Sequence, residues 1–178
     1  MGLIGLIGDT HGYIDDRIMH HLADCDEIWH TGDWGPEPVE TKLNEYKPVR
    51  GVYGNIDDHR LRLDFPEYVY FNYQGLQVFM IHISGPFGSY APRVKEVLKG
   101  KRPGLFICGH SHILKVQRDP KYKFLYINPG AAGLHGFHKV RTLIKLKIEE
   151  GKVLDIAVVE LGPRAKEELS DELDGLFN

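Results

Sequence analysis

Seven side chains that can bind a metal ion follow five short apolar segments of the sequence. They are carboxylate, imidazole and amide groups with no thiolate among them, namely Asp9, His11, Asp33, Asn55, His82, His110 and His112. Oxygen and nitrogen ligands of this kind suit manganese, iron, zinc or nickel. Seven ligands exceed the needs of one tetrahedral site, but two ions that share a carboxylate could each take four. Asp33 is the natural bridge, so we expect two divalent ions.

Two pairs of these residues share one spacing, Asp9 with His11 and His110 with His112. In an extended segment, side chains two positions apart point the same way, so each pair could hold one ion. Each residue also has a purely structural interpretation. Asp9 alone is better explained as a turn former, and Asn55 could equally be one. His82 could be a satisfied core histidine, so the metal interpretation depends on the whole set.

The apolar segments predict the elements that position these side chains. Strands are expected at residues 3–7, 27–31 and 48–53, with helices at 14–23 and 38–46 between them. Polar residues at the carboxyl end of each strand are typical of an α/β sheet whose ligand site lies along that edge. The site should therefore collect at one edge of the sheet.

The second half of the sequence predicts a hairpin, a helix and a further strand, followed by antiparallel strands. The expected ranges are 68–71 and 77–83 for the hairpin, 91–98 for the helix, 105–108 for the strand, and 115–118, 124–127, 140–148 and 152–161 for the antiparallel strands. Together with the first half, this pattern predicts an α/β protein with two packed sheets and helices outside. Residues 163–178 carry a weak helical stripe, which suggests a docked terminal helix or a frayed tail.

Composition places limits on the class of protein. With 178 residues, 42% of them hydrophobic and 26% charged, the chain fits one domain over residues 1–162, with 163–178 as a helix or tail of that domain. A net charge of -3 gives no basic face for nucleic acid. Cys25 and Cys108 are isolated, and no apolar run reaches the ~18 residues of a membrane span. We therefore expect a soluble cytoplasmic protein with no membrane or nucleic-acid partner.

Six further histidines are less informative. His20, His21, His59, His135 and His138 are expected on a helix or in loops, as ordinary polar residues. His30 precedes the turn that carries Asp33. Two interpretations are equally favoured: it orients a metal ligand through a hydrogen bond, or it has no such role.

The order of the motifs resembles the calcineurin-like metallophosphoesterase superfamily, and within it the small single-domain bacterial and archaeal phosphodiesterases. The motifs are GDTH at 8–11, GD at 32–33, GNID at 54–57, His82, GHSH at 109–112 and NPGA at 128–131. The resemblance implies a four-layer αββα sandwich, in which helices flank two mixed β-sheets and a two-metal site lies at the strand ends. It assigns Asp9, His11 and His112 to the first ion. Asn55, His82 and His110 would bind the second ion, and Asp33 would bridge the two.

The same resemblance implies a phosphoric ester hydrolase, in particular a phosphodiesterase. Two ions about 3.5 Å apart would present a bridging hydroxide to the phosphorus of a small phosphate ester. Manganese is the ion expected first, with nickel, zinc or iron as alternatives. Asp33, Asn55, His110 and Asp57 would be catalytic, with Asp57 orienting a ligand histidine.

Two positions depart from the family pattern. Ile56 stands where the family often has a histidine that stabilises the transition state or protonates the leaving group, and isoleucine can do neither. Ile83 stands where a glycine usually follows the ligand histidine. Substrates with poor leaving groups should therefore be disfavoured, and the pocket near the second metal should be reshaped.

Alternative functions remain open on the sequence. The chain is also similar to the retromer scaffold subunit, so a non-catalytic interaction module is the second hypothesis, although every ligand position is filled here. A nuclease ranks last because there is no basic stripe. Residues 85–90 and 134–138 are rich in glycine and aromatic residues and are candidate walls of a substrate pocket. A homodimer is consistent with the resemblance, but no self-complementary patch indicates one.

Overall fold

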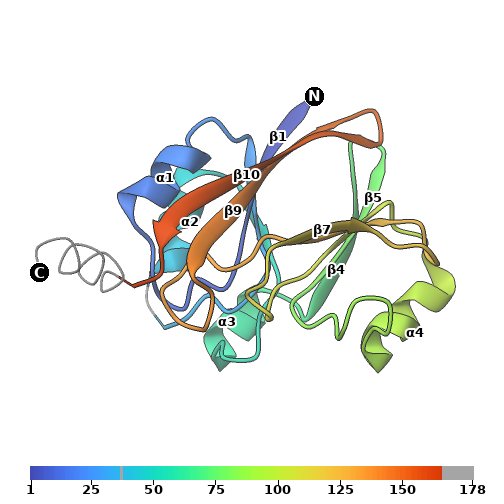
Figure 1. Cartoon of the computed structure of the whole chain (residues 1–178), viewed down its shortest axis with the longest axis horizontal. Helices are drawn as coiled ribbons and strands as arrows, with labels where there is room; N and C mark the ends of the chain where they lie inside the picture. The colour runs from blue at the N-terminus through green and yellow to red at the C-terminus, as the bar shows by residue number, and fades with distance from the viewer. Residues whose placement is uncertain (37, 166–178) are drawn as a thin grey trace, which may run out of the picture.

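The computed structural model describes residues 1–36 and 38–165 and contains two five-stranded mixed sheets (Figure 1). The first sheet has the order β10-β9-β1-β2-β3, with bounds Gly2–Ile7 for β1, Glu27–His30 for β2, Val49–Gly51 for β3, Val140–Glu149 for β9 and Lys152–Pro163 for β10. The second sheet has the order β4-β5-β6-β8-β7, with bounds Tyr68–Tyr73, Leu76–Ile81, Leu105–Ile107, Leu125–Asn128 and Lys115–Arg118. In the first sheet β1, β2 and β3 pair in parallel, and β9 and β10 add an antiparallel edge. In the second sheet the central pairs are parallel and both edge pairs are antiparallel.

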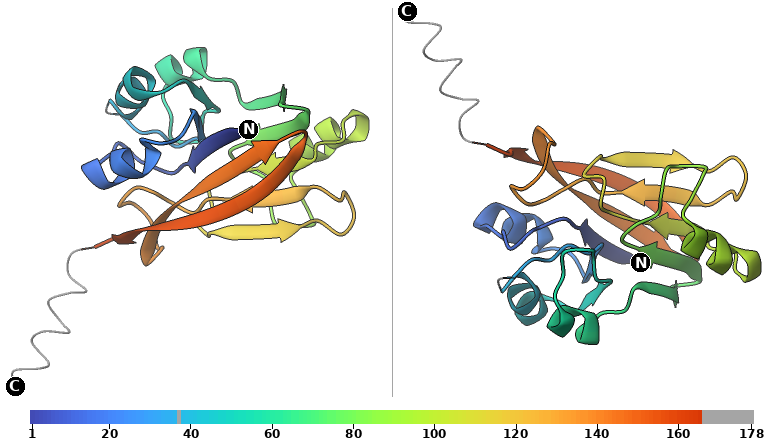
Figure 2. Two further views of the ribbon diagram at one scale, coloured as in Figure 1. Left: turned by 90° about the horizontal axis from the view of Figure 1, so that it is seen from above. Right: turned by 90° about the horizontal axis from the view of Figure 1, so that it is seen from below.

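Within residues 1–36 and 38–165, four helices cover the outer faces of the sheets. Helices α1 (Asp16–Leu22), α2 (Val39–Tyr46) and α3 (His59–Asp64) lie against the first sheet, and α4 (Pro92–Gly100) lies against the second (Figure 2). The predicted four-layer αββα sandwich is confirmed, because three separate apolar layers fill the spaces between sheets and helices.

The alternation of side chains along β1 shows how the sequence builds these layers. Ile4 and Leu6 point into the core between the two sheets, where they meet Val78 and Ile107 of the second sheet. Ile7 points the other way, into the core beneath α1 and α2. Successive side chains of a strand face opposite sides, so a strand covered on both faces is apolar throughout. This is why the sequence before Asp9 is one continuous apolar run.

Aspartate side chains cap the first turns of two helices. The Asp15 carboxylate accepts a hydrogen bond from the backbone N–H of Ile18 and caps α1. Asp58 accepts from Leu61 in the same way and caps α3. The α3 helix was not expected from the sequence. His59 was placed in a loop, but it is the first residue of this helix.

Most other elements were predicted within two or three residues of their ends. The strand expected at 48–53 is shorter, because β3 ends at Gly51. Beyond it, the Val52 N–H still donates to the His30 carbonyl, but the Tyr53 N–H donates to the Pro66 carbonyl outside the sheet. The helix or tail expected at 163–178 lies outside the described residues beyond Ala165, and the domain bounds stay a prediction. Among the described residues, no helix has the length and apolar character needed to cross a membrane.

Candidate metal centre

The segments that follow β1 and β2 continue side by side after the strands end. The backbone N–H of Asp9 donates to the Gly32 carbonyl at 3.0 Å, and that of His11 donates to the Asp33 carbonyl at 3.0 Å. This pairing places Asp9, His11 and Asp33 in fixed register at one edge of the first sheet. The carboxyl ends of parallel strands meet at such an edge, as the sequence predicted.

Five of the seven predicted ligand residues have a left-handed backbone. The φ angles are 50° at Asp9, 49° at His11, 54° at Asp33, 68° at His110 and 57° at His112. The extended conformation assumed for the two pairs is therefore wrong. Tight turns bring Asp9 and His11 to one group of donor atoms, but they direct His110 and His112 to two different groups, so this second pair does not hold one ion as expected. Left-handed backbone at a non-glycine residue costs about 1 kcal/mol or more and gathers at functional sites. The structure keeps this strain where the candidate donor atoms converge.

The first group of donor atoms combines two carboxylates with two histidines. One ligand atom from each of Asp9, His11, Asp33 and His112 lies within 4.8 Å of all the others. His112 Nε2 is 3.3 Å from Asp9 Oδ1 and 3.3 Å from His11 Nε2, and His11 Nε2 is 3.6 Å from Asp33 Oδ2. These contacts bring together residues more than 100 positions apart in the chain.

The second group shares Asp33 with the first. Donor atoms of Asp33, His82 and His110 lie within 4.8 Å of one another, and His82 Nε2 is 3.2 Å from Asp33 Oδ1. The side-chain oxygen of Asn55 is 3.1 Å from the same His82 nitrogen. Asp33 thus turns its Oδ2 to the first group and its Oδ1 to the second.

The two carboxylates are deeply buried and lack a permanently charged partner. Asp9 is 0% exposed and Asp33 is 2% exposed. Among the described residues, every ion pair of these two carboxylates is with a histidine, and no lysine or arginine takes part. Buried carboxylates without a cation are costly, so this donor set fits bound divalent ions.

His82 is held in the orientation that frees one nitrogen for a ligand bond. Its Nδ1–H donates to the Thr31 carbonyl at 2.8 Å, which leaves Nε2 facing Asp33 and Asn55. Burial lowers the pKa of His82, but the Asp33 hydrogen bond and the charge of Asp9 outweigh it and raise the pKa overall. Burial likewise raises the pKa of Asp33, but the contact with His82 outweighs it and leaves the pKa below its usual value.

His30 supports the loop around the site and contacts no ligand side chain through a hydrogen bond. It accepts from the Gly32 N–H at Nδ1, and its Nε2 lies 3.1 Å from Thr10 Oγ1. Its ring stacks on Trp34 at 3.6 Å. Complete burial holds its pKa well below the usual value, so the neutral ring acts as a fixed part of the turn.

Asp57 does not orient a ligand histidine as predicted. Its two oxygens accept from backbone N–H groups, Gly54 at 2.7 Å and Gly35 at 3.1 Å. Burial raises the pKa of this carboxyl. Asp57 therefore holds together the two loops that carry Asn55 and Asp33. Its carboxylate bonds to the Gly54 backbone three residues earlier, as in a turn, and forms no hydrogen bond with a described histidine.

Gly54 permits the closest approach in the centre. A Cβ atom at this position would collide with the backbone nitrogen and Oδ1 of Asp33. Only glycine lets the Asn55 loop pack against Asp33 in this way.

A cavity of about 480 Å³ opens over both donor groups. Ile56, which stands where the family often has a histidine, forms part of its wall and is 45% exposed. The predicted wall segment 134–138 contributes His135, Gly136, Phe137 and His138. The other predicted wall, 85–90, contributes Gly85, Pro86 and Phe87 to a neighbouring cavity.

Two histidines that the sequence treated as ordinary loop residues lie beside the centre. The His135 ring is 4.7 Å from the His11 ring, and the His138 ring is 5.3 Å from the His112 ring. The glycine-rich segment that contains them was the available signal, but nothing in their own spacing indicated contact with the ligand histidines.

An α/β sandwich of two mixed sheets with clustered carboxylates and histidines at its strand ends defines a metallohydrolase-like class of protein. The family model of the calcineurin-like phosphoesterase superfamily domain matches residues 3–151. The chain therefore belongs to the calcineurin-like phosphoesterase superfamily. A probable metallophosphoesterase of Methanothermobacter thermautotrophicus is 27% identical over 173 residues, which cover 90% of this chain and 93% of the relative.

Solved structures show the same fold at low sequence identity. An archaeal phosphodiesterase has a TM-score of 0.70 at 19% identity, with 89% of this chain and 99% of the other covered. Vps29 of Chaetomium thermophilum has a TM-score of 0.70 at 13% identity, with 90% and 97% covered. A predicted phosphoesterase of Streptococcus pneumoniae has a TM-score of 0.62 at 18% identity, with 89% and 97% covered.

Proposed function

We propose that the protein is a metal-dependent phosphodiesterase with a centre for two divalent ions, manganese first among them. The observation that carries this proposal is the placement of Asp33, whose two oxygens face two separate groups of donor atoms. A shared carboxylate is the arrangement that a two-metal hydrolase needs.

The donor groups divide the ligands as the family resemblance implies. Asp9, His11 and His112 would hold one ion, His82, His110 and Asn55 the other, and Asp33 both. When bound, the ions supply charge neutralisation for the phosphate and an activated water. The chain itself orients the ligands: Thr31 fixes the His82 ring, and Asp57 fixes the loop of Asn55.

The cavity favours substrates that need little help with the leaving group. Ile56 presents only a hydrocarbon surface there, so it cannot donate a proton to a departing alkoxide. An ester with an acidic leaving group, such as bis-p-nitrophenyl phosphate, should therefore be hydrolysed without a proton donor at this position. We expect this diester to react faster than p-nitrophenyl phosphate; both release p-nitrophenolate, so the comparison tests diester against monoester and not the leaving group.

The test is hydrolysis of these two esters by purified protein with manganese, nickel, zinc or a chelator added. We expect turnover that requires a divalent ion and a loss of about 10³-fold in Asp33→Asn. His20→Gln, a change on the outer helix α1, is the matched control and should keep full activity.

Metal content separates the outcomes. Wild-type protein should retain two ions per chain after desalting, and Asp33→Asn should retain fewer. If no ion restores turnover of either ester and Asp33→Asn changes nothing, the enzyme proposal fails. An interaction module on the same fold then becomes the better account.

A further inference from the structure

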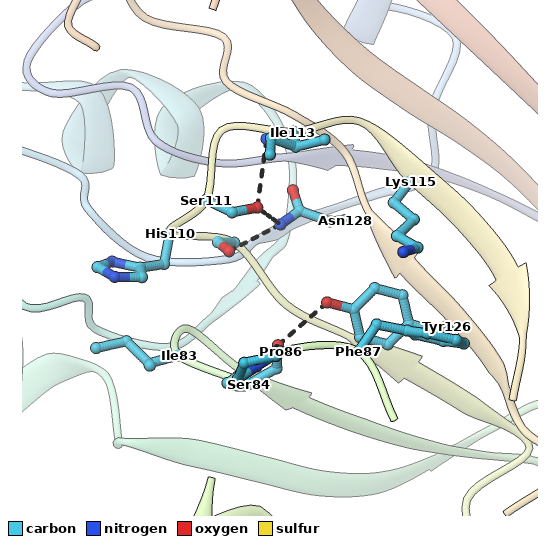
Figure 3. Close-up of a pocket in the computed structure, with 12 residues that line it drawn as sticks. Ile83, Ser84, Pro86, Phe87, His110, Ser111, Ile113, Lys115, Tyr126 and Asn128 are labelled. Atoms are coloured by element: carbon cyan, nitrogen blue, oxygen red, sulfur yellow. Dashed lines mark hydrogen bonds between the residues drawn. The ribbon is translucent and has the colours of Figure 1, made fainter. Parts of the chain in front are cut away.

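A second cavity of about 490 Å³ lies directly beside the candidate metal centre (Figure 3). It shares His110, Ser111 and Ile113 with the cavity over the donor groups. A group attached to a phosphate in the metal centre could therefore extend past His110 into this second cavity. Its inner wall is built from Tyr126 and Asn128 of the second sheet.

Most polar groups of this cavity already have hydrogen-bond partners. The Ser84 hydroxyl donates to the Gly85 carbonyl at 2.8 Å and lies 3.1 Å from the Tyr126 hydroxyl, which accepts from the Cys108 thiol. The Tyr126 proton is thereby directed to Ser84. The Asn128 amide donates both its protons, to the Gly109 carbonyl and to Ser111 Oγ, and its oxygen accepts from Gly130.

Two donors are left over. Ser111 Oγ accepts from Asn128 and from the Ile113 N–H, so its own proton has no acceptor among the described residues. The Lys115 ammonium forms no ion pair with any described carboxylate. No aspartate or glutamate lines the cavity. The uncommitted groups are therefore donors with one net positive charge, which is the complement of an anion.

Aromatic packing holds the ammonium in place. Lys115 Nζ lies 4.5 Å from the centre of the Phe87 ring, and that ring packs edge-on against Tyr126 at 5.1 Å. Figure 3 shows the lysine side chain reaching into the cavity on the side opposite His110. A positive charge fixed over an aromatic ring loses little freedom when it binds an anion.

From these observations we propose that the second cavity binds the organic group that remains on the phosphate, and that Lys115 pairs with a second anionic group carried by it. The preferred substrates are then phosphodiesters with a remote phosphate. This inference rests on the proposed function, because it assumes that the reacting phosphate occupies the metal centre.

Two diesters that differ only in the remote phosphate test the inference. They are thymidine 5′-(p-nitrophenyl phosphate) and the same compound with a 3′-phosphate. In both, water adds to the 5′ phosphorus, the bond to the p-nitrophenolate oxygen breaks, and the water proton is released. The leaving group is identical, so a difference in kcat/KM reports on the rest of the molecule. We expect the 3′-phosphate to raise kcat/KM about tenfold, as a charge-assisted hydrogen bond does.

Substitutions assign the preference to one residue. Lys115→Met keeps an unbranched apolar stem without the ammonium and should reduce the preference to about one, whereas Lys115→Arg should keep most of it. Lys121 lies over the Tyr122 ring at 5.0 Å and lines neither of the two cavities, so Lys121→Met is the matched control and should keep the full preference.

The outcomes distinguish this inference from the proposed function. Turnover of both diesters at equal kcat/KM by the wild-type protein would overturn the Lys115 assignment and leave the phosphodiesterase intact. So would a preference that survives Lys115→Met. Failure to hydrolyse either diester or bis-p-nitrophenyl phosphate with any metal would instead overturn the proposed function. Calorimetry tests the subsite independently of turnover. We expect Lys115→Met to bind thymidine 3′,5′-bisphosphate more weakly than the wild-type protein does.

Discussion

The two sheets contribute different chemistry to the metal centre. Both buried carboxylates, Asp9 and Asp33, follow strands of the first sheet. Three of the four histidines in the donor groups, His82, His110 and His112, follow strands of the second. The negative charge thus comes from one half of the sandwich and most of the neutral ligands from the other. Neither half alone contains a complete site.

The loops of the two halves are also held differently. The first-sheet loops pair with each other through backbone hydrogen bonds, as between His11 and Asp33. The loop after β6 has one such backbone bond, from the Gly109 N–H to the His82 carbonyl, and it is held further by side chains. The His110 N–H donates to Asp9 at 3.1 Å, and Asn128 donates to the Gly109 carbonyl. Packing of the apolar faces in the shared core therefore assembles the site as the sheets dock.

The largest expected effect comes from removing one ligand on each side of this divide. Asp9→Asn and His110→Ala should each lower turnover of bis-p-nitrophenyl phosphate by about 10³-fold with manganese present. Their effects on the metal-free protein should differ. Asp9 is fully buried near a second carboxylate, so Asp9→Asn should relieve repulsion and raise the apo Tm by about 3 °C.

His110 is exposed, so His110→Ala should leave the apo Tm within about 1 °C of wild type. Differential scanning calorimetry in chelator measures both values. An Asp9→Asn protein that is less stable than wild type without metal would show that the carboxylate stabilises the fold. That result would contradict the interpretation that the first sheet supplies this buried negative charge for the metal ions.

A somewhat smaller effect should follow from adding a methyl group at Gly54, where the loop that carries Asn55 packs against Asp33. In Gly54→Ala the added methyl would collide with Asp33, so the loop must move and the free energy of unfolding should fall by about 3 kcal/mol. Gly100 is the control, because a Cβ there meets nothing within 4 Å. Gly100→Ala should be neutral or stabilising by up to about 1 kcal/mol, measured by urea unfolding. Equal stability of the two variants would contradict the close packing at Gly54.

The fold was largely predictable because hydrophobic periodicity marks strands and helices directly. Continuous apolar runs such as that of β1 indicated strands covered on both faces, and short turns indicated the antiparallel β9–β10 pair. The α3 helix was missed because four of its six residues are polar or charged and only Leu61 is buried. Without an apolar stripe, a helix this short gives no periodic signal.

The candidate site was predictable as a set of residues but not as a geometry. The order of motifs indicated which side chains converge, and the structure brings the predicted ligands together. The left-handed turns at Asp9 and His110 were not predictable, because ligand residues are kept there against the usual preference for glycine. The role of Asp57 was mistaken because its partners are backbone groups, which carry no sequence signal.

The smallest effect should come from a contact at the apolar cluster between the second sheet and α4, which contains no candidate ligand. The Tyr90 hydroxyl donates to the buried Asp119 carboxylate, which also accepts from two backbone N–H groups. Burial raises the pKa of Asp119, but these hydrogen bonds outweigh it and leave the pKa below the ordinary 3.8. Tyr90→Phe should cost about 1.5 kcal/mol at pH 7 and leave turnover unchanged. Tyr122→Phe is the control, since the Tyr122 hydroxyl has no hydrogen-bond partner among the described residues.

The pH dependence of that cost follows from the direction of the shift. A carboxyl whose pKa is lowered by folding stabilises the protein above its unfolded pKa, and this contribution is lost as the pH falls through the folded pKa. The difference in unfolding free energy between wild type and Tyr90→Phe should therefore narrow below pH ~4. Urea unfolding at pH 7 and pH 3 measures it. A difference in unfolding free energy that stays constant with pH would contradict the role assigned to the ionised Asp119 carboxylate. A loss of turnover in Tyr90→Phe would contradict the independence of this contact from the candidate metal centre.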